Sequence, residues 1–319
     1  MIINMLISSL EQGLGYALMA LGVYLTFRVL DFPDLTVDGS FPMGAAITAR
    51  LIIGGVDPLV ATLYSLLGGA VAGLITGLLN TKLKITGLLA GILTMTALYS
   101  VNLRIMGRSN LPLLRQPTLL RYVEGLGISR RYVAIITFVI IVLLIKVLVD
   151  YFLHTELGMA LRATGNNPAM IRSLGVNTDL MVILGLALAN ALVALSGSLV
   201  AQHQGFADAG MGIGMIIIGL ASVIIGESVI RSGRIIWATL GVLVGSIVYR
   251  FAVTMALRMG FAPTDLKLVT AILVVFALAA PILKKKDLGV LNALWKKRVK
   301  SRNVKFKRSS KGFQSGSDK

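Results

Sequence analysis

The sequence predicts an all-α polytopic membrane protein, from two properties of its composition and one of its patterning. Hydrophobic residues make up 56% of the 319-residue chain, charged residues only 14%, and the mean hydropathy is +0.84. A soluble domain carries about 25% charged residues, so this chain has too little polar surface to cover itself in water. Uncharged stretches also recur at about the 20-residue length of a spanning helix; they are 58–81, 85–103, 180–207 and 209–226.

The apolar segments predict eight or nine transmembrane helices. The eight clear segments are 5–30, 57–79, 85–104, 132–153, 179–201, 210–230, 235–256 and 266–283. A ninth, 38–56, is interrupted by polar residues, which leaves the count at eight or nine. No Lys or Arg precedes Arg28. The N-terminal segment therefore lacks the charged start of a signal peptide, and we expect it to be the first span.

A break is predicted in the N-terminal third of the chain. Between residues 31 and 44, an otherwise apolar region contains three carboxylates, two glycines and the prolines Pro33 and Pro42. Proline removes a backbone donor and disfavours an uninterrupted helix. Irregular backbone at membrane depth survives only where it is buried in protein or lines a cavity. Residues 31–50 are therefore predicted to contribute to a translocation pathway, with an ordinary loop before a tilted helix as the alternative.

The net charge of +17 is concentrated after Leu283, where thirteen Lys or Arg residues face only Asp287 and Asp318. A basic segment beside the last span is typical of a cytoplasmic tail held near anionic membrane lipid. We therefore expect a transmembrane permease domain over 1–283 and a disordered basic cytoplasmic tail over 284–319. No nucleic-acid-binding motif accompanies the charge, so a nucleic-acid partner is not expected.

The basic loops predict the orientation of the chain in the cytoplasmic membrane. With the C-terminus in the cytoplasm, counting back through the spans places 154–178 there too, and then Lys82 and Lys84. The same count places the arginine-rich loop 104–131 outside, against the statistical rule. Either one span is miscounted or this long loop departs from the rule, and we favour the second explanation.

The residues that enzymes use are scarce. There is no Cys, and His154 and His203 are the only histidines, so no metal-binding cluster is expected. No Gly-Lys dipeptide occurs, which excludes a phosphate-binding loop of the Gly-x-x-x-x-Gly-Lys type. The sequence therefore predicts a protein that is not an enzyme and binds no cofactor directly.

Residues 154–178 predict two short helices between membrane spans. The first, about 155–164, is expected to end at Gly165 in the left-handed cap conformation. The second is expected to begin with Asn167 as N-cap and Pro168 at the first helical position, and to end at Gly175. Such a compact helical unit on the cytoplasmic side is typical of a docking surface, with an elbow anchored at the lipid surface by its arginines as the alternative.

This segment carries a family resemblance. The pattern Gly-x-x-Leu-Arg-Ala-x-Gly over 158–165, followed by Asn-Pro-Ala at 167–169 and Leu-Gly-Val-Asn at 174–177, resembles the coupling loop of permease subunits of branched-chain amino acid and ribose-type ABC importers. The resemblance extends over residues 7–283. The Thr-Val-Asp-Gly-Ser stretch at 36–40 is similar to the branch that imports tryptophan or tyrosine.

The resemblance implies a permease without its own motor. A cytosolic ABC ATPase would use ATP and dock on the coupling loop, an extracellular substrate-binding lipoprotein would deliver the solute, and a second permease copy would complete a homodimer. A small solute, most simply an amino acid, would cross by alternating access. The residues that the resemblance assigns to the ATPase contact are Gly158, Leu161, Arg162, Ala163, Gly165, Ala169, Leu174 and Gly175.

Polar residues inside the spans are the candidates for the pathway, because such groups usually face a cavity or a partner. They are Asp38, Ser40, Asn102 and Asn190, with hydrogen bonding between helices as the alternative role. Two other functions stay open: an ion-driven secondary transporter, and an ABC permease for a sugar or nucleoside. An ion-driven protein would need carboxylates deep in the spans, and these stretches have almost none.

Two patterns are interpreted as structural. Glycines at four-residue steps, namely Gly69, Gly73 and Gly77 and then Gly241 and Gly245, are expected to let helices approach closely within the subunit. Two pairs of opposite charges four residues apart are expected to form ion pairs along a helix; they are Lys146 with Asp150 and Glu227 with Arg231.

Overall fold

A computed structural model describes residues 2–114, 116–125, 127, 129–230, 232–260, 265, 268–272 and 274–275 of the chain. The predicted tail, 284–319, and most of the predicted last span, 266–283, lie outside these residues. The division between a permease domain and a tail therefore stays a prediction.

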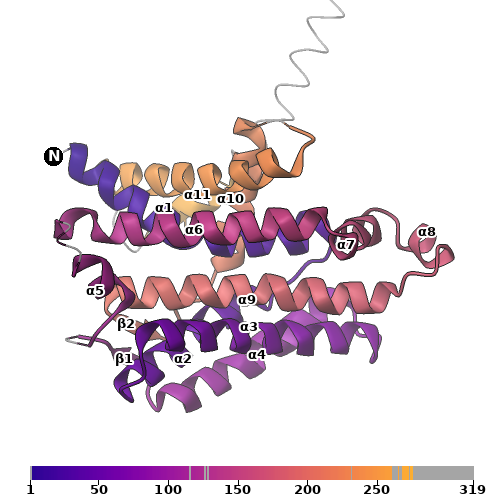
Figure 1. The fold of residues 1–319 in the computed structure, drawn as a ribbon, viewed down its shortest axis with the longest axis horizontal. Helices are drawn as coiled ribbons and strands as arrows, with labels where there is room; N and C mark the ends of the chain where they lie inside the picture. The colour runs from indigo at the N-terminus through magenta and orange to yellow at the C-terminus, as the bar shows by residue number, and fades with distance from the viewer. Residues whose placement is uncertain are drawn as a thin grey trace, which may run out of the picture. The chain divides into compact units, whose positions relative to one another are not determined.

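The described part of the chain is built from helices and one short two-stranded ribbon (Figure 1). The helices are α1 (Ile2–Tyr24) with its π-helical continuation η1 (Leu25–Val29), α2 (Val37–Ile53), α3 (Pro58–Thr81), α4 (Gly87–Met106), α5 (Leu119–Glu124), α6 (Arg130–His154), α7 (Glu156–Asn166), α8 (Pro168–Ser173), α9 (Thr178–Gln204), α10 (Met215–Val229) and α11 (Ile235–Arg258). Strand β1 (Asn110–Pro112) pairs antiparallel with β2 (Phe206–Asp208).

Six of the described helices are long and apolar enough to cross a membrane: α1 with η1, α3, α4, α6, α9 and α11. The helices α2 and α10 have 17 and 15 residues. At about 1.5 Å per residue they are shorter than the hydrocarbon core of about 30 Å. The predicted crossing at 210–230 is therefore a shorter helix, because β2 and the turns that follow it, including Gly214 at φ +88°, occupy the first part of that segment.

The predicted interruption at 31–44 is longer than the one observed. Residues 30–36 are not helical, but α2 begins at Val37 and has Pro42 inside it. Proline leaves the carbonyl four residues earlier, that of Asp38, without its helical partner. Gly212 lies against this carbonyl so closely that a Cβ atom there would be 1.9 Å from the oxygen. The freed carbonyl is thus covered by another part of the chain, and the helix continues.

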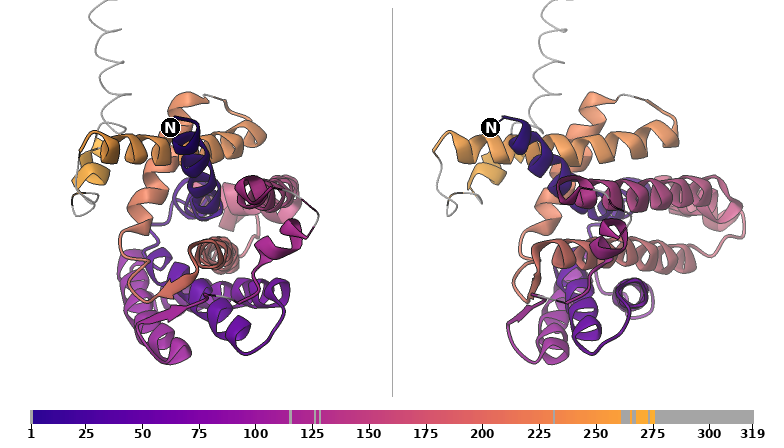
Figure 2. Two further views of the ribbon diagram at one scale, coloured as in Figure 1. Left: turned by 90° about the vertical axis from the view of Figure 1, so that its left-hand side faces the viewer. Right: turned by 60° about the vertical axis from the view of Figure 1, so that its left-hand side comes forward.

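Helix α9 lies at the centre of the described helices and packs against the glycine face of α3 (Figures 1 and 2). A Cβ atom on Gly73 would be 2.1 Å from the carbonyl oxygen of Leu186, and Gly69 and Gly77 meet the α9 backbone in the same way. Between α11 and α10, a Cβ atom on Gly245 would similarly be 2.0 Å from a carbonyl oxygen of α10. The prediction that these glycines serve packing within the subunit is confirmed.

Side-chain caps fix the beginnings of several helices. The Asp57 carboxylate accepts the backbone N–H of Leu59 at 2.9 Å, and Pro58 occupies the first position of α3. Asn177 accepts the N–H of Leu180 at 3.1 Å and starts α9. Because each cap lies beside the helix that it starts, these boundaries follow from local sequence.

The long helices connect two opposite ends of the bundle (Figures 1 and 2). One end carries α7 and α8, and we name it the coupling-loop end after the resemblance described above. Lys84 at this end lies 3.7 Å from Asp179 at the start of α9. The other end, named the ribbon end, carries α5, β1 and β2, and the Gln202 side chain there accepts the backbone N–H of Leu119 at 2.9 Å. Residues 82–84 and 154–178 therefore share one end, while 104–131 lies at the other, as the count of spans predicts.

Candidate functional site

The inner face of the coupling loop is packed against the spans. Thr155 caps α7, and Leu161 is fully buried. A Cβ atom on Gly158 would be 2.1 Å from the carbonyl oxygen of Phe152, and one on Gly165 would be 2.1 Å from that of Val29 in η1. The prediction that Gly165 ends the helix in a left-handed cap is wrong, because α7 continues to Asn166 and the glycine is needed for the close approach of η1.

The second helix of the loop follows the prediction. Asn167 caps α8 by accepting the N–H of Met170 at 3.0 Å, Pro168 is its first residue, and Gly175 follows it at φ +85°. These features are local, so the sequence alone was sufficient to place them.

The outer face of the coupling loop exposes large apolar side chains. Leu174 is 66% exposed and Met170 58%, and Leu157 and Met159 are each 51% exposed. Of the residues that the family resemblance assigns to the ATPase contact, Ala169 and Leu174 belong to this outer face, whereas Gly158 and Leu161 point into the permease. The resemblance assigns neither methionine nor Leu157 to the contact. The position of Met159, two residues before the buried Leu161, could have revealed it, because residues two apart do not share a helix face.

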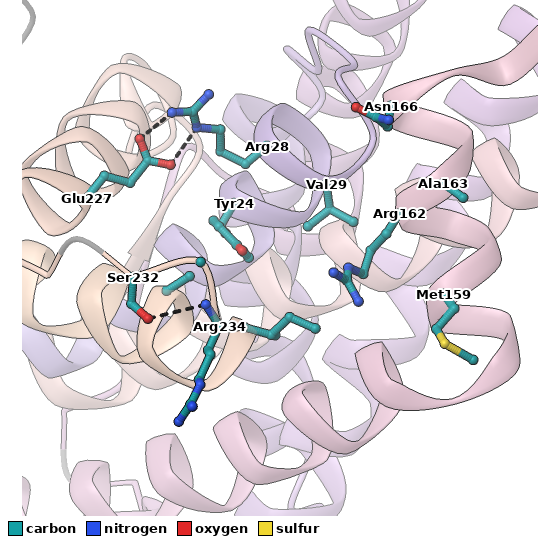
Figure 3. Close-up of a pocket in the computed structure, with 13 residues that line it drawn as sticks. Tyr24, Arg28, Val29, Met159, Arg162, Ala163, Asn166, Glu227, Ser232 and Arg234 are labelled. Carbon is teal, nitrogen blue, oxygen red and sulfur yellow. Dashed lines mark hydrogen bonds and ion pairs between the residues drawn. The ribbon is translucent and has the colours of Figure 1, made fainter.

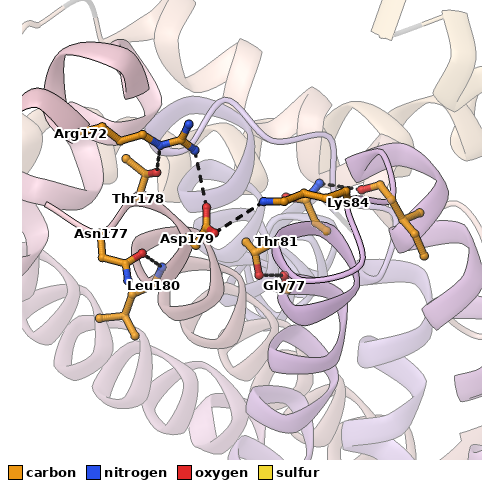
Figure 4. Close-up of polar contacts among 10 residues, drawn as sticks. Gly77, Thr81, Lys84, Arg172, Asn177, Thr178, Asp179 and Leu180 are labelled. Atoms are coloured by element: carbon orange, nitrogen blue, oxygen red, sulfur yellow. Dashed lines mark hydrogen bonds and ion pairs between the residues drawn. The ribbon is translucent and has the colours of Figure 1, made fainter.

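An ion-pair cluster fastens the coupling loop to two spans (Figure 4). The Arg172 guanidinium donates to the hydroxyl of Thr178 at 2.6 Å and lies 3.6 Å from the Asp179 carboxylate. Lys84, in the connection between α3 and α4, lies 3.7 Å from the same carboxylate. These contacts connect α8 with the start of α9 and with the connection between α3 and α4.

Beside α7 a pocket of about 630 Å³ opens between the coupling loop, η1 and the α10–α11 connection (Figure 3). Arg162 points into it, and Arg28 on its wall donates two hydrogen bonds of 2.5 Å to Glu227. The predicted partner of Glu227, Arg231, lies outside the described residues. The pair of Glu227 with Arg231 therefore stays a prediction, and the pair that the structure shows joins η1 to α10.

Two of the predicted pathway residues belong to a buried polar network. Ser40 donates to the Asn190 side-chain oxygen at 2.7 Å, and both residues are fully buried. The Asn190 amide nitrogen donates to the Asp34 carboxylate at 2.7 Å and to the Leu186 carbonyl at 3.0 Å. The network joins the non-helical segment 30–36 and α2 to the middle of α9.

Asp38 connects the beginnings of two short helices. It lies in the first turn of α2, and its carboxylate accepts the backbone N–H groups of Gly214 and Ile216, each at 2.9 Å. These donors belong to the N-terminus of α10, where a negative charge is favourable. Nothing in the local sequence indicates this contact, since it joins residues 176 positions apart.

Asn102 and Asp38 line one pocket of about 360 Å³ between α2, α4 and the turn before α10. The Asn102 side-chain nitrogen donates to the Gly39 carbonyl at 3.1 Å, and its buried oxygen has no hydrogen-bond partner among the described residues. The pocket has the size of a small-molecule site. Its other lining residues are Gly39, Pro42, Met95, Thr96, Tyr99, Ser100, Ala209 and Ile213.

Charged residues deep in α6 form a structural pair. Lys146 and Asp150 pair as predicted, and Asp150 also accepts a hydrogen bond of 2.6 Å from Thr239 of α11. In the part of the chain that the structure describes, no group of His, Asp and Glu residues could hold a metal ion.

The helical fold with six candidate spans and an exposed two-helix loop at one end is that of a polytopic membrane protein. The chain belongs to the permease-component family of the branched-chain amino acid transport system, whose model matches residues 5–279. It is a multi-pass permease subunit of an ABC importer.

Three relatives show the range of this family. The chain is 47% identical to a tyrosine transport system permease protein of Clostridioides difficile (strain R20291), over 86% of this chain and 90% of that one. It is 27% identical to the galactofuranose transporter permease protein of Escherichia coli (strain K12), over 85% and 78%. It is also 27% identical to the ribose import permease protein of the same strain, over 78% and 76%.

Proposed function

We propose that this permease imports an amino acid of the aromatic class, with tyrosine as the first solute to test. The supporting observation is the 47% identity with a tyrosine transport system permease, against 27% with the sugar permeases. The stretch Thr-Val-Asp-Gly-Ser at 36–40, which suggested the aromatic branch, contains Asp38 and Ser40, both of which contact other helices.

The proposal includes three partners and an orientation. A cytosolic ATPase docks on the outer face of the coupling loop and is the only subunit that uses ATP. An extracellular binding protein docks on the ribbon end, and a second copy of the permease completes the transporter. The C-terminus is cytoplasmic, and α2, α10 and the predicted span at 266–283 bring the number of crossings from six to eight or nine. Family membership supports an ATPase partner most directly.

We further propose that the solute passes the pocket between α2 and α4. Asp38 and Asn102 line that pocket, and apolar and aromatic groups such as Met95 and Tyr99 complete it. A pathway of this composition fits a transporter in which the binding protein supplies most of the selectivity.

Reconstitution tests the function. The permease, its ATPase and its binding protein are assembled in lipid vesicles, and uptake of labelled tyrosine is measured with and without ATP, in competition with leucine and with ribose. The expected result is ATP-dependent uptake of labelled tyrosine that neither leucine nor ribose inhibits. Full uptake by the permease alone under an ion gradient would instead establish the secondary-transporter alternative.

The docking surface is tested separately with Leu174→Asp. Because Leu174 is 66% exposed, an added charge should leave folding unchanged, while apolar contact with the ATPase is lost. We expect at least a tenfold loss of ATPase retention on the purified permease. Leu114→Asp, at a 76% exposed leucine of the ribbon end, is the matched control and should retain the ATPase. Equal retention by both variants would remove the outer face from the contact.

A further inference from the structure

The pocket beside α7 lies at the level where membrane spans end. Two of its lining residues mark span boundaries: one candidate span ends at Val29 and another begins at Ile235. In a bilayer this is the depth of the phospholipid headgroups. The pocket is therefore placed where the chain leaves the hydrocarbon core on the coupling-loop side.

The pocket carries an excess of positive charge. Its lining includes Arg28, Arg162 and Arg234, and only Glu227 opposes them. Arg28 is neutralised by Glu227, whereas the side chains of Arg162 and Arg234 form no ion pair with any described residue. The hydroxyl of Tyr24, on the same wall, also has no hydrogen-bond partner among the residues described.

The residues that line the pocket match the chemistry of a phospholipid headgroup. Guanidinium groups bind phosphate through two parallel hydrogen bonds, and basic pockets between helices on the cytoplasmic side of a membrane favour phospholipid headgroups. Besides the arginines, the pocket is lined by the apolar residues Val29, Met159 and Ile235, with which a free phosphate would make no favourable contact. A phosphate joined to glycerol and acyl chains would use both parts.

We propose that this pocket binds the phosphate of an anionic phospholipid, held by Arg162 of the coupling loop and Arg234 at the start of α11. The lipid joins two elements that are distant in sequence: α7, which leads into the proposed ATPase contact, and the α10–α11 connection. The state of the coupling loop thereby becomes sensitive to the composition of the cytoplasmic leaflet. This site is independent of the solute that the permease carries.

Calorimetry on the full-length permease in detergent tests the proposal. The titrants are dioctanoyl phosphatidylglycerol, dioctanoyl phosphatidylcholine and inorganic phosphate. We expect the anionic lipid to bind best, with about fivefold weaker binding for Arg162→Gln or Arg234→Gln and about 25-fold weaker binding for the double variant. Arg104→Gln, at an exposed arginine near the end of α4, is the matched control and should bind like the wild type.

The other outcomes also decide. Tight binding of inorganic phosphate that competes with the lipid would assign the same arginines to a free phosphate. Equal affinity of the wild type and the double variant for phosphatidylglycerol would overturn the site. Loss of ATPase retention in a double variant that still binds the lipid normally would overturn it too, and would assign both arginines to the protein partner.

Discussion

At the scale of single residues, Asn190 joins three parts of the chain through one amide. It accepts from Ser40 and donates to Asp34 and to the Leu186 carbonyl, all at 2.7–3.0 Å. A buried carboxylate that loses a partner is costly, because neither water nor another group replaces it.

We therefore expect Asn190→Leu to lower the free energy of unfolding by about 2–4 kcal/mol. Thermal unfolding of the purified protein in detergent measures the change. Asn80→Leu, which removes one half-buried bond to the Ile85 carbonyl, is the control and should cost about 1 kcal/mol. If Asn190→Leu unfolds at the wild-type temperature, the network contributes nothing to stability.

A second contact between residues, at the ribbon end, predicts that the stability of the fold depends on pH. The hydroxyl of Tyr122 donates to the Asp57 carboxylate, which lowers the pKa of Asp57 and raises the pKa of Tyr122. A carboxyl group with a lowered folded-state pKa stabilises above its unfolded pKa of about 3.9 and loses that effect as the pH falls through the folded value. For the tyrosine, stabilisation is complete below its unfolded pKa of about 10 and disappears as the pH rises through the raised value.

We accordingly expect Tyr122→Phe to unfold at a lower temperature than the wild type between about pH 5 and pH 9. The difference should shrink on both sides of this window. Tyr64→Phe, at an exposed tyrosine of α3, should show no such profile. A pH-independent difference for Tyr122→Phe would mean that the hydrogen bond does not shift the pKa values of Asp57 and Tyr122.

At the scale of elements, glycine faces determine how closely the spans approach. Gly73→Ala would place a Cβ atom 2.1 Å from the Leu186 oxygen, so α3 and α9 would have to separate. Overpacking of this kind costs about 1–3 kcal/mol. We expect the free energy of unfolding to fall by this amount, measured by thermal unfolding in detergent. Gly233→Ala is the matched control, since a Cβ there meets nothing within 4 Å. Equal stability of the two variants would show that the helix pair adjusts freely.

Elements also differ in how much of them could be predicted. The start of α8 at Asn167 and Pro168 is correct, because the cap and its helix are adjacent in sequence. The predicted end of the preceding helix at Gly165 is wrong, since that glycine is needed for close packing against the backbone of η1. Pro42 was interpreted as a helix breaker, yet α2 continues through it, with Gly212 packed against the carbonyl that the proline leaves free.

At the scale of the whole molecule, the two ends of the bundle predict a labelling experiment. The chain has no native cysteine, so single cysteines can be introduced without background. We expect Gln116→Cys, exposed at the ribbon end, to react with a membrane-impermeant maleimide on intact cells, because the proposed orientation places this end outside. Met170→Cys, in the coupling loop, should react only after permeabilisation.

The cysteine-free wild type is the background control for both variants. The reverse labelling pattern would invert the proposed orientation and place the coupling loop outside. Labelling of both positions on intact cells would show that an even number of spans separates them.

The sequence by itself determined the membrane class, the approximate positions of the long helices, the capped two-helix loop and the packing glycines. Each of these depends on composition, periodicity or neighbouring residues, so distant parts of the chain are not needed to recognise them. Only the tertiary structure decided that Asp38 caps α10, that Glu227 pairs with Arg28 and that Arg162 faces a pocket. Such contacts join residues far apart in sequence, and the partner of a buried or half-buried polar group is set by which helices come together.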